Sequence, residues 1–273
     1  MDSKDTEIIK NTKKLIVKVA KDNYTGHIPS SYSCLEILYT LYTRGFANIT
    51  LKNASDLIRD RVILSKEHAR LGHICLLAEL GLIQKEIAPT WQQNNGRIGH
   101  DMFGGLEGRS DIAAVDPACS SLGMGLGLGI GYAIAAPNNN IYVIVGDGEL
   151  QEGSLWEAIM YIGHHKMKNI TLIVDRNTRQ IEGPTKDMID TSSCVDKQIG
   201  SFHFDCIECN GHDIDDIERA LKVKTELPKC IIANTIKGKE CTFLLDENKR
   251  SHPYLHSCTY TPEEYDRIIK EIL

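Results

Sequence analysis

Two polar residues follow apolar runs at a spacing that could create a cation site. Residues 141–145 read as a buried strand, and Asp147 follows them in the tripeptide 146–148. A second apolar run at 170–174 leads to Asn177. Because the carboxyl ends of parallel strands meet at one edge of a sheet, both side chains are expected there. Their oxygens suit Mg²⁺, which completes its octahedron with phosphate oxygens and water. An ordinary Asp-Gly turn after a strand is the alternative for Asp147.

These residues need a scaffold of alternating strands and helices, and the rest of the chain predicts one. Apolar runs predict strands at 61–64, 141–145, 170–174 and 229–233, and apolar periodicity predicts helices at 4–21, 34–42, 69–80, 154–165 and 214–224. A last helix is expected to open at Thr261, with Pro262 in its first turn. We therefore expect an α/β fold with a mostly parallel sheet and helices on both faces. Residues 1–273 contain no repeat or clear linker and are expected to form one domain.

Composition limits the partners and the compartment. A net charge of −6 over 273 residues disfavours nucleic acid and anionic membranes as partners. Nine cysteines without regular spacing, and a polar start without a signal-peptide apolar region, predict a cytoplasmic protein. Residues 117–146 lack charged side chains and raise the alternative of a membrane span, but glycines, prolines and three asparagines interrupt them.

Several short motifs, in the same order along the chain, are similar to those of the amino-terminal half of transketolases. They are TGHIP at 25–29, DRVILSKEH at 60–68, SLGMG at 121–125, GDG at 146–148, EG at 152–153, Asn177, IEG at 181–183, NGHD at 210–213 and TIKGK at 235–239. The resemblance implies the diphosphate-binding module of the thiamine-diphosphate-binding fold, with thiamine diphosphate (ThDP) and Mg²⁺ as cofactors. It also implies transfer of a two-carbon ketol unit from a ketose or ketose phosphate donor to an aldose acceptor.

The resemblance assigns metal and diphosphate contacts to five positions. Asp147, Asn177 and the main-chain carbonyl of Arg179 match Mg²⁺ ligands of the family. Gly146 and Gly148 match a turn whose backbone approaches the diphosphate closely. Glycine permits this approach because it has no side chain.

Leu122 and Gly123 open a glycine-rich run at 123–131. By the same resemblance this run is a helix start that packs against the cofactor, so both residues are cofactor-binding candidates. Tight helix packing alone is the alternative. Dinucleotide binding lacks the strand that should precede such a run.

Five histidines are candidates for the catalytic site. His27 and His68 match histidines that line the thiazolium and substrate channel in transketolases, although a lone histidine is more often a surface or core residue. His100 matches a histidine before the glycine run, unless residue 109, an arginine, occupies that place. His252 and His256 are alternatives for a histidine near the end of the module, and spacing does not choose between them.

Two residues depart from the family pattern near the expected substrate site, and two further glutamates match residues at a subunit interface. By the same resemblance, Glu67 and Met124 stand at substrate-facing positions where the family has glycine and a glutamine or histidine. They leave open another ThDP reaction, decarboxylation of a 2-oxo acid with acyl transfer to a sugar. Glu152 and Glu157 match carboxylates that connect two active sites across a subunit interface, and ordinary surface glutamates are the alternative.

A pair of cysteines raises the alternative of a zinc site. Cys206 and Cys209 have CxxC spacing, but two further ligands at a suitable distance in sequence are missing. The alternation of Phe202, Phe204 and Cys206 with polar residues predicts a strand instead.

A residue that the chemistry needs is missing from these motifs. ThDP is activated by a glutamate that hydrogen-bonds its pyrimidine ring. In transketolases this glutamate lies on a second, pyrimidine-binding domain, whereas the sequence ends at Leu273 after the last predicted helix. We therefore expect a separate pyrimidine-binding, C-terminal-type transketolase subunit in an α2β2 assembly that acts on sugars or sugar phosphates. A non-catalytic scaffold that keeps the fold is the alternative.

Overall fold

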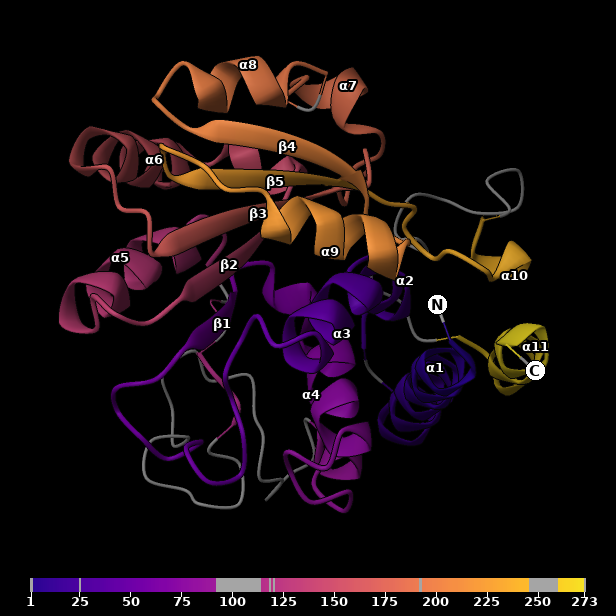
Figure 1. Ribbon diagram of the computed structural model, residues 1–273. Helices are drawn as coiled ribbons and strands as arrows, with labels where there is room; N and C mark the ends of the chain where they lie inside the picture. The colour runs from indigo at the N-terminus through magenta and orange to yellow at the C-terminus, as the bar shows by residue number, and fades with distance from the viewer. Residues whose placement is uncertain are drawn as a thin grey trace.

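A five-stranded parallel sheet forms the centre of the molecule (Figure 1). The computed structural model describes residues 2–24, 26–91, 114–117, 119, 121–191, 193–245 and 260–272. The strands are β1 (Arg61–Leu64), β2 (Ile141–Gly146), β3 (Ile170–Arg176), β4 (Asp205–Asn210) and β5 (Lys229–Asn234), in the spatial order β1-β2-β3-β5-β4. The predicted parallel α/β fold is confirmed.

Helices cover both faces of this sheet. They are α1 (Ser3–Asn23), α2 (Ile28–Ser33), α3 (Leu35–Thr43), α4 (Arg70–Glu79), α5 (Gly125–Ala135), α6 (Gly153–His165), α7 (Thr185–Met188), α8 (Val195–Gly200), α9 (Ile214–Lys222), α10 (Thr242–Leu245) and α11 (Pro262–Ile272), with 3-10 turns η1 (Glu67–Ala69), η2 (Ala88–Thr90) and η3 (Gly148–Gln151). None of the helices in the described part of the chain is long and apolar enough to cross a membrane.

The strands divide their side chains between two cores, because successive residues of a strand point to opposite faces. On β2, Tyr142 and Ile144 join the core that contains α1, α3, α4, α9 and α11. Val143 and Val145 join the other core, with α5, α6 and α8. Strands buried on both faces explain the nearly continuous apolar runs in the sequence.

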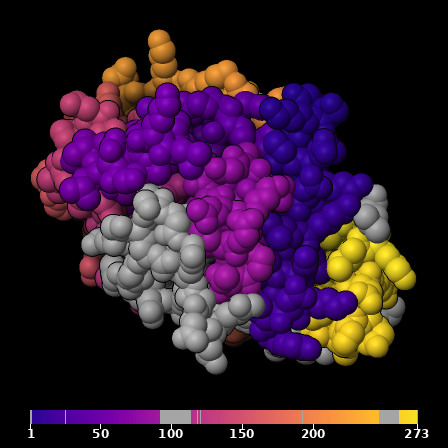
Figure 2. Space-filling model, turned by 90° about the horizontal axis from the view of Figure 1, so that it is seen from below, coloured from indigo at the N-terminus to yellow at the C-terminus, as the bar shows by residue number. Residues whose placement is uncertain are grey.

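The first and last helices lie side by side. Figure 2 shows α11 against the N-terminal part of the chain, and the Tyr265 hydroxyl donates to the carbonyl of Ala20 at 3.2 Å. The predicted start of α11 is confirmed, because Thr261 and Glu264 cap each other's backbone N–H groups at 2.9 and 3.3 Å. This reciprocal capping box satisfies two donors that the first helical turn leaves open.

The strand expected around Phe202 begins later than predicted. Phe202 lies in a turn in which His203 adopts φ 65°, and β4 starts only at Asp205. Alternation in sequence did not reveal that turn. Cys206 packs into the α5–α6–α8 core and Cys209 into the opposite core, so the two sulfurs lie on opposite sheet faces and cannot share a zinc ion.

Candidate active site

A cavity of about 410 Å³ lies where β1, β2, β3 and β5 end. Most of its walls come from the segments that follow these four strands, and His27, between α1 and α2, adds to them. The lining residues are His27, Glu67, His68, Leu122, Gly146, Asp147, Gly148, Glu149, Gln151, Glu152, Asn177, Arg179, Gln180, Ile181, Glu182 and Lys237. A cavity at the carboxyl edge of a parallel sheet is the usual ligand site of such folds.

Asp147 and Asn177 lie side by side on neighbouring strand ends, as the sequence predicts. Gly146 is in register with Asp175 on β3, and both candidate ligands are almost fully buried. The carboxylate of Asp147 accepts the N–H groups of Gly148 at 3.0 Å and Thr178 at 2.6 Å. These bonds tie the turn after β2 to the turn after β3.

Thr178 holds an unusual backbone conformation between Asn177 and Arg179. Its φ of 60° is the left-handed region, which a β-branched residue adopts only at a cost. That conformation directs the Thr178 N–H to Asp147. Strain of this kind is typical of ligand sites, where the surroundings hold it in place.

A buried ion pair lies beneath these residues and orients the amide of Asn177. Lys66 and Asp175 are fully buried and paired, and Asp175 also accepts from Ser33 at 2.5 Å and from Thr235. Burial by itself raises the pKa of Asp175, but Lys66 and the hydroxyl donors hold it below its ordinary value. The Asn177 amide donates its Nδ2 to the same carboxylate at 3.2 Å, which fixes which side of the amide presents oxygen.

The donor set at Asp147 fits a hard divalent cation. Burial raises the pKa of Asp147 to about 7, and Asp175 adds to this, while the N–H groups of Thr178 and Gly148 oppose it. A cation would stabilise such a carboxylate. In the described part of the chain, no group of three or more His, Cys, Asp or Glu side chains is arranged to hold a metal. An ion here would therefore depend on amide, main-chain, phosphate and water oxygens, as Mg²⁺ commonly does.

Lys237 provides positive charge to the same cavity, and we did not expect this role from the sequence, although Lys237 belongs to the motif at 235–239. It is 5% exposed, and burial lowers its pKa to about 7, with a further lowering by Lys66 that Asp175 and Asp147 oppose. A buried ammonium on a cavity wall favours an anionic ligand. Its position after β5 was the available signal, since that strand ends at the same sheet edge.

Two histidines meet on another wall of the cavity. The rings of His27 and His68 have centroids 6.1 Å apart, and both are half-buried. His27 precedes α2 and His68 lies in η1, directly after β1. Glu67 also lines the cavity, whereas Met124 is half-exposed and is not among the lining residues.

Glu149 is a second residue that the sequence analysis missed. Its buried carboxylate accepts from the Ser65 hydroxyl and from the N–H groups of Gly123 at 2.7 Å and Gly146 at 3.0 Å. It therefore joins the end of β1, the turn before α5 and the end of β2. Its position two residues after Asp147 gave no sign of these long-range contacts.

The other predicted site residues have different positions. Leu122, Gly146, Gly148 and Glu152 line the cavity, the last at the exposed start of α6. Gly123 does not line it but packs behind it, with φ 83° and no room for a side chain beside Glu152 and Ser154. Glu157 is exposed on α6, away from the lining. His100, Arg109, His252 and His256 lie outside the described residues.

Comparison with known proteins agrees with this geometry. The family model for the transketolase, thiamine diphosphate binding domain, matches residues 4–253. The chain is 36% identical over 242 residues to an apulose-4-phosphate transketolase subunit of Actinobacillus succinogenes, covering 85% of this chain and 84% of that protein. It is 31% identical over 255 residues to a 6-deoxy-6-sulfo-D-fructose transketolase subunit of Clostridium sp., covering 90% and 88%.

A solved structure shows the same similarity in three dimensions. The transketolase of Campylobacter jejuni superposes with a TM-score of 0.80 at 25% identity. The match covers 100% of this chain but 43% of that transketolase, so the chain spans less than half of that protein's length.

Proposed function

The chain belongs to the transketolase family, as its thiamine-diphosphate-binding domain, and we propose that it is the diphosphate-binding subunit of a two-chain transketolase. The complex transfers a two-carbon ketol unit from a ketose donor to an aldose acceptor. One observation carries this proposal: a single cavity collects Asp147, Asn177, Lys237 and two histidines at the end of the sheet.

Within this proposal, each lining residue has a defined task. Asp147, Asn177 and the main-chain carbonyl of Arg179 would hold Mg²⁺. Gly146 and Gly148 would leave space for the diphosphate, and Lys237 would pair with its charge. Bound ThDP would supply the carbon nucleophile that carries the two-carbon unit.

The histidines act on the sugar. The rings of His27 and His68 lie 6.1 Å apart. They form hydrogen bonds with the oxygens of the ketose substrate and transfer protons to and from them, because imidazole can act as an acid and as a base near neutral pH. Glu67 on the same wall hydrogen-bonds a sugar hydroxyl. One of His100, His252 and His256 completes the set.

A second chain supplies the pyrimidine-binding half of the site. The relative from Actinobacillus succinogenes is named as one subunit of a transketolase, which supports this division. Apolar side chains are exposed beside the cavity, at Leu122 (36%) and Ile181 (49%), and on the outer sides of α5 and α6, at Ile134 (59%) and Met160 (46%). We propose an α2β2 assembly in which these residues are covered and Glu152 and Glu157 connect two sites.

The names of the relatives support a proposal for the substrate class. The similar proteins are named for apulose 4-phosphate and for a sulfonated fructose. We propose a ketose that carries an anionic group as donor, converted in the cytoplasm. The eight cysteines in the described part are free thiols, in keeping with such a reducing compartment.

Turnover of two kinds of donor tests the reaction class. The tagged chain, purified with its partner, is given ketose phosphates or 2-oxo acids together with an aldose acceptor. Ketose turnover supports transketolase chemistry, whereas turnover of 2-oxo acids alone contradicts it and favours decarboxylating acyl transfer.

A substitution of Asp147 tests whether this chain is catalytic. Asp147→Ala is expected to weaken Mg²⁺-dependent ThDP binding by about 100-fold or more, since even residues behind a metal ligand contribute 10- to 100-fold. Asp187→Ala, at an exposed position of α7, serves as the control and should bind normally. Unchanged cofactor content and activity in Asp147→Ala would instead support a scaffold.

A further inference from the structure

We propose that His212 is a positioning residue, which fixes the turn that carries Lys237 into the cofactor cavity. His212 does not line that cavity. The inference rests on the function proposed above, because it gives His212 a role in binding the cofactor through Lys237.

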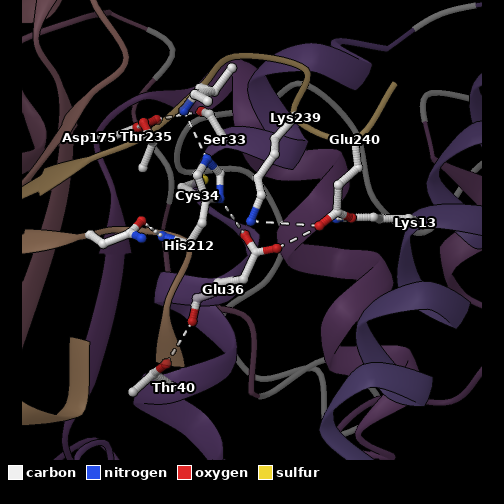
Figure 3. A network of polar contacts seen from close by, with 12 residues as sticks. Lys13, Ser33, Cys34, Glu36, Thr40, Asp175, His212, Thr235, Lys239 and Glu240 are labelled. Carbon is white, nitrogen blue, oxygen red and sulfur yellow. Dashed lines mark hydrogen bonds and ion pairs between the residues drawn. The ribbon is translucent and has the colours of Figure 1, made fainter. Parts of the chain in front are cut away.

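The ring of His212 bridges two distant parts of the chain. It follows β4, and its side chain is 4% exposed. Its Nε2 accepts the backbone N–H of Ile236 at 2.8 Å. Its Nδ1 lies 3.0 Å from the carboxylate of Glu36 on α3 (Figure 3). Ile236 immediately precedes Lys237.

These partners determine the protonation of the ring. A backbone N–H can only donate, so the Nε2 that faces Ile236 must carry a lone pair. The single ring proton then lies on Nδ1 and is donated to Glu36. A doubly protonated ring would place two N–H groups against each other at 2.8 Å.

Glu36 is held as an anion that requires this proton donor. It is 3% exposed and lies 3.5 Å from the ammonium of Lys13 on α1, which also pairs with Glu240 at 2.5 Å. Although burial raises the pKa of Glu36, the bond from His212 and the charge of Lys13 bring it below its ordinary value. Lys239 pairs with the same Glu240 at 3.6 Å, and Lys10 and Glu271 are further charged residues that line the cavity beside His212.

This network lies outside the cofactor cavity. Lys13, Glu36, His212, Lys239 and Glu240 line a second cavity of about 450 Å³, which shares no lining residue with the cofactor cavity. His212 therefore connects the helical layer of α1 and α3 to the cofactor site without contacting the cofactor.

The Ile236 N–H is one of the two backbone anchors that directly flank Lys237 in this turn, and the Gly238 N–H is the other. The Ile236 side chain is 51% exposed, so the backbone, and not the side chain, holds this position. Thr235 binds Asp175 on one side, and the Gly238 N–H donates to Pro29 at 3.1 Å on the other. Because the anchors at Thr235 and Gly238 remain without His212, its loss should displace Lys237 rather than unfold the turn.

Two substitutions of His212 distinguish the effect of its hydrogen-bond acceptor from the effect of its size. His212→Gln can place an amide oxygen near the position of Nε2 and keep the bond to Ile236, whereas His212→Leu has similar size and no acceptor. In the tagged full-length chain with its co-purified partner, we expect His212→Leu to raise the Kd for Mg²⁺-ThDP about tenfold, roughly the value of one hydrogen bond. His212→Gln should change it less than threefold, and kcat at saturating ThDP should fall less than twofold in either variant.

The outcomes distinguish this inference from the proposed function. An unchanged Kd in His212→Leu, or an equal loss of affinity in both variants, overturns the role of the acceptor and leaves the proposed function standing. A wild-type complex that binds no Mg²⁺-ThDP overturns the proposed function and with it the role in cofactor binding.

A measurement on the wild-type protein covers the case in which His212→Leu does not fold. Nitrogen NMR of the His212 ring should show a proton on Nδ1 and none on Nε2, and hydrogen exchange of the Ile236 amide should be slow. The opposite tautomer, or a rapidly exchanging Ile236 amide, overturns the inference without any variant.

Discussion

At the scale of single residues, the cavity combines groups that are costly to bury separately. The carboxylate of Asp147 and the ammonium of Lys237 both have pKa values shifted by burial to about 7. Each group is close to losing its charge in the protein alone. A ligand that brings both a divalent cation and a phosphate anion would stabilise the two charged forms together.

Lys237 offers the sharpest test at this scale. Lys237→Met keeps most of the side-chain volume and removes the charge, so Mg²⁺-ThDP binding should weaken by about 10- to 100-fold, the value of a charge-assisted hydrogen bond. Calorimetric titration of the purified complex measures this.

The matched control lies two residues further along the chain. Lys239→Met removes a half-buried lysine that faces the second cavity, and its cofactor affinity should stay within about twofold. Equal losses in both variants would mean that general charge, and not the position of Lys237, attracts the diphosphate.

The sequence could identify residues that directly follow predicted strands, and it failed for residues defined by distant partners. Asp147 and Asn177 follow β2 and β3, so the geometry of a parallel sheet brought them together. The role of Glu149 depends on Ser65 and Gly123, which are far away in sequence. No local pattern encodes such contacts.

At the scale of elements, a buried histidine joins α3 and α4 and makes the free energy of unfolding depend on pH. His73 on α4 lies 2.8 Å from the Tyr42 hydroxyl, and burial lowers its pKa to about 4, with Asp116 opposing and Arg70 adding. The unfolded chain binds the proton near pH 6.5 and the folded chain only near pH 4. The free energy of unfolding should therefore decrease as pH falls from 6.5 towards 4.

This linkage predicts a specific difference between variants. At pH 5, His73 should cost the wild-type protein about 2 kcal/mol relative to pH 7, measured by urea unfolding of the full chain. His73→Gln, which does not titrate, should lose that part of the pH dependence. His164→Gln, at an exposed site on α6, should retain it, and identical slopes in all three proteins would contradict a buried neutral His73.

Helix α5 approaches the end of β1 most closely at Gly125. A Cβ at Gly125 would lie 2.5 Å from the Cβ of Ser65, whereas a Cβ at Gly127 meets nothing within 4 Å. Gly125→Ala should destabilise the chain by about 1–3 kcal/mol, since α5 must move away from the edge of the sheet. Gly127→Ala should be neutral or more stable by up to about 1 kcal/mol. Urea unfolding compares the two, and equal stabilities would contradict the close approach.

Element types were predictable where periodicity was strong, and boundaries were less so. The runs at 141–145, 170–174 and 229–233 are β2, β3 and β5 within two residues. The predicted helix at 34–42 is α3, but the separate short helix α2 before it, which begins next to Pro29, was not expected. Strand β4 starts later than predicted because His203 lies in a turn with a positive φ, which the sequence does not indicate.

At the scale of the whole molecule, the two cores account for the stability of the sheet but leave the cavity open on one side. Exposed apolar side chains at Leu122 and Ile181 lie at its rim. A site that keeps its cofactor away from water needs these surfaces covered. The parallel fold followed from sequence pattern, whereas a partner surface follows only from the assembled structure.

A substitution of Gly127 also tests whether the outer side of α5 contacts another chain in the assembly. If the outer side of α5 packs against another chain, Gly127→Ala should not lower the unfolding free energy of the isolated chain but should reduce the amount of partner that co-purifies. Lys270→Ala, at an exposed position of α11 far from α5 (Figure 1), is the control and should leave that amount unchanged. A normal yield of partner with Gly127→Ala would contradict a close contact through α5.

Native mass spectrometry of the tagged chain, purified from its own source in Mg²⁺ and ThDP, would show whether the protein works with a second chain. We expect an equimolar complex with a second chain of similar size, of α2β2 mass and carrying ThDP. A homo-oligomer without cofactor would contradict the two-chain transketolase.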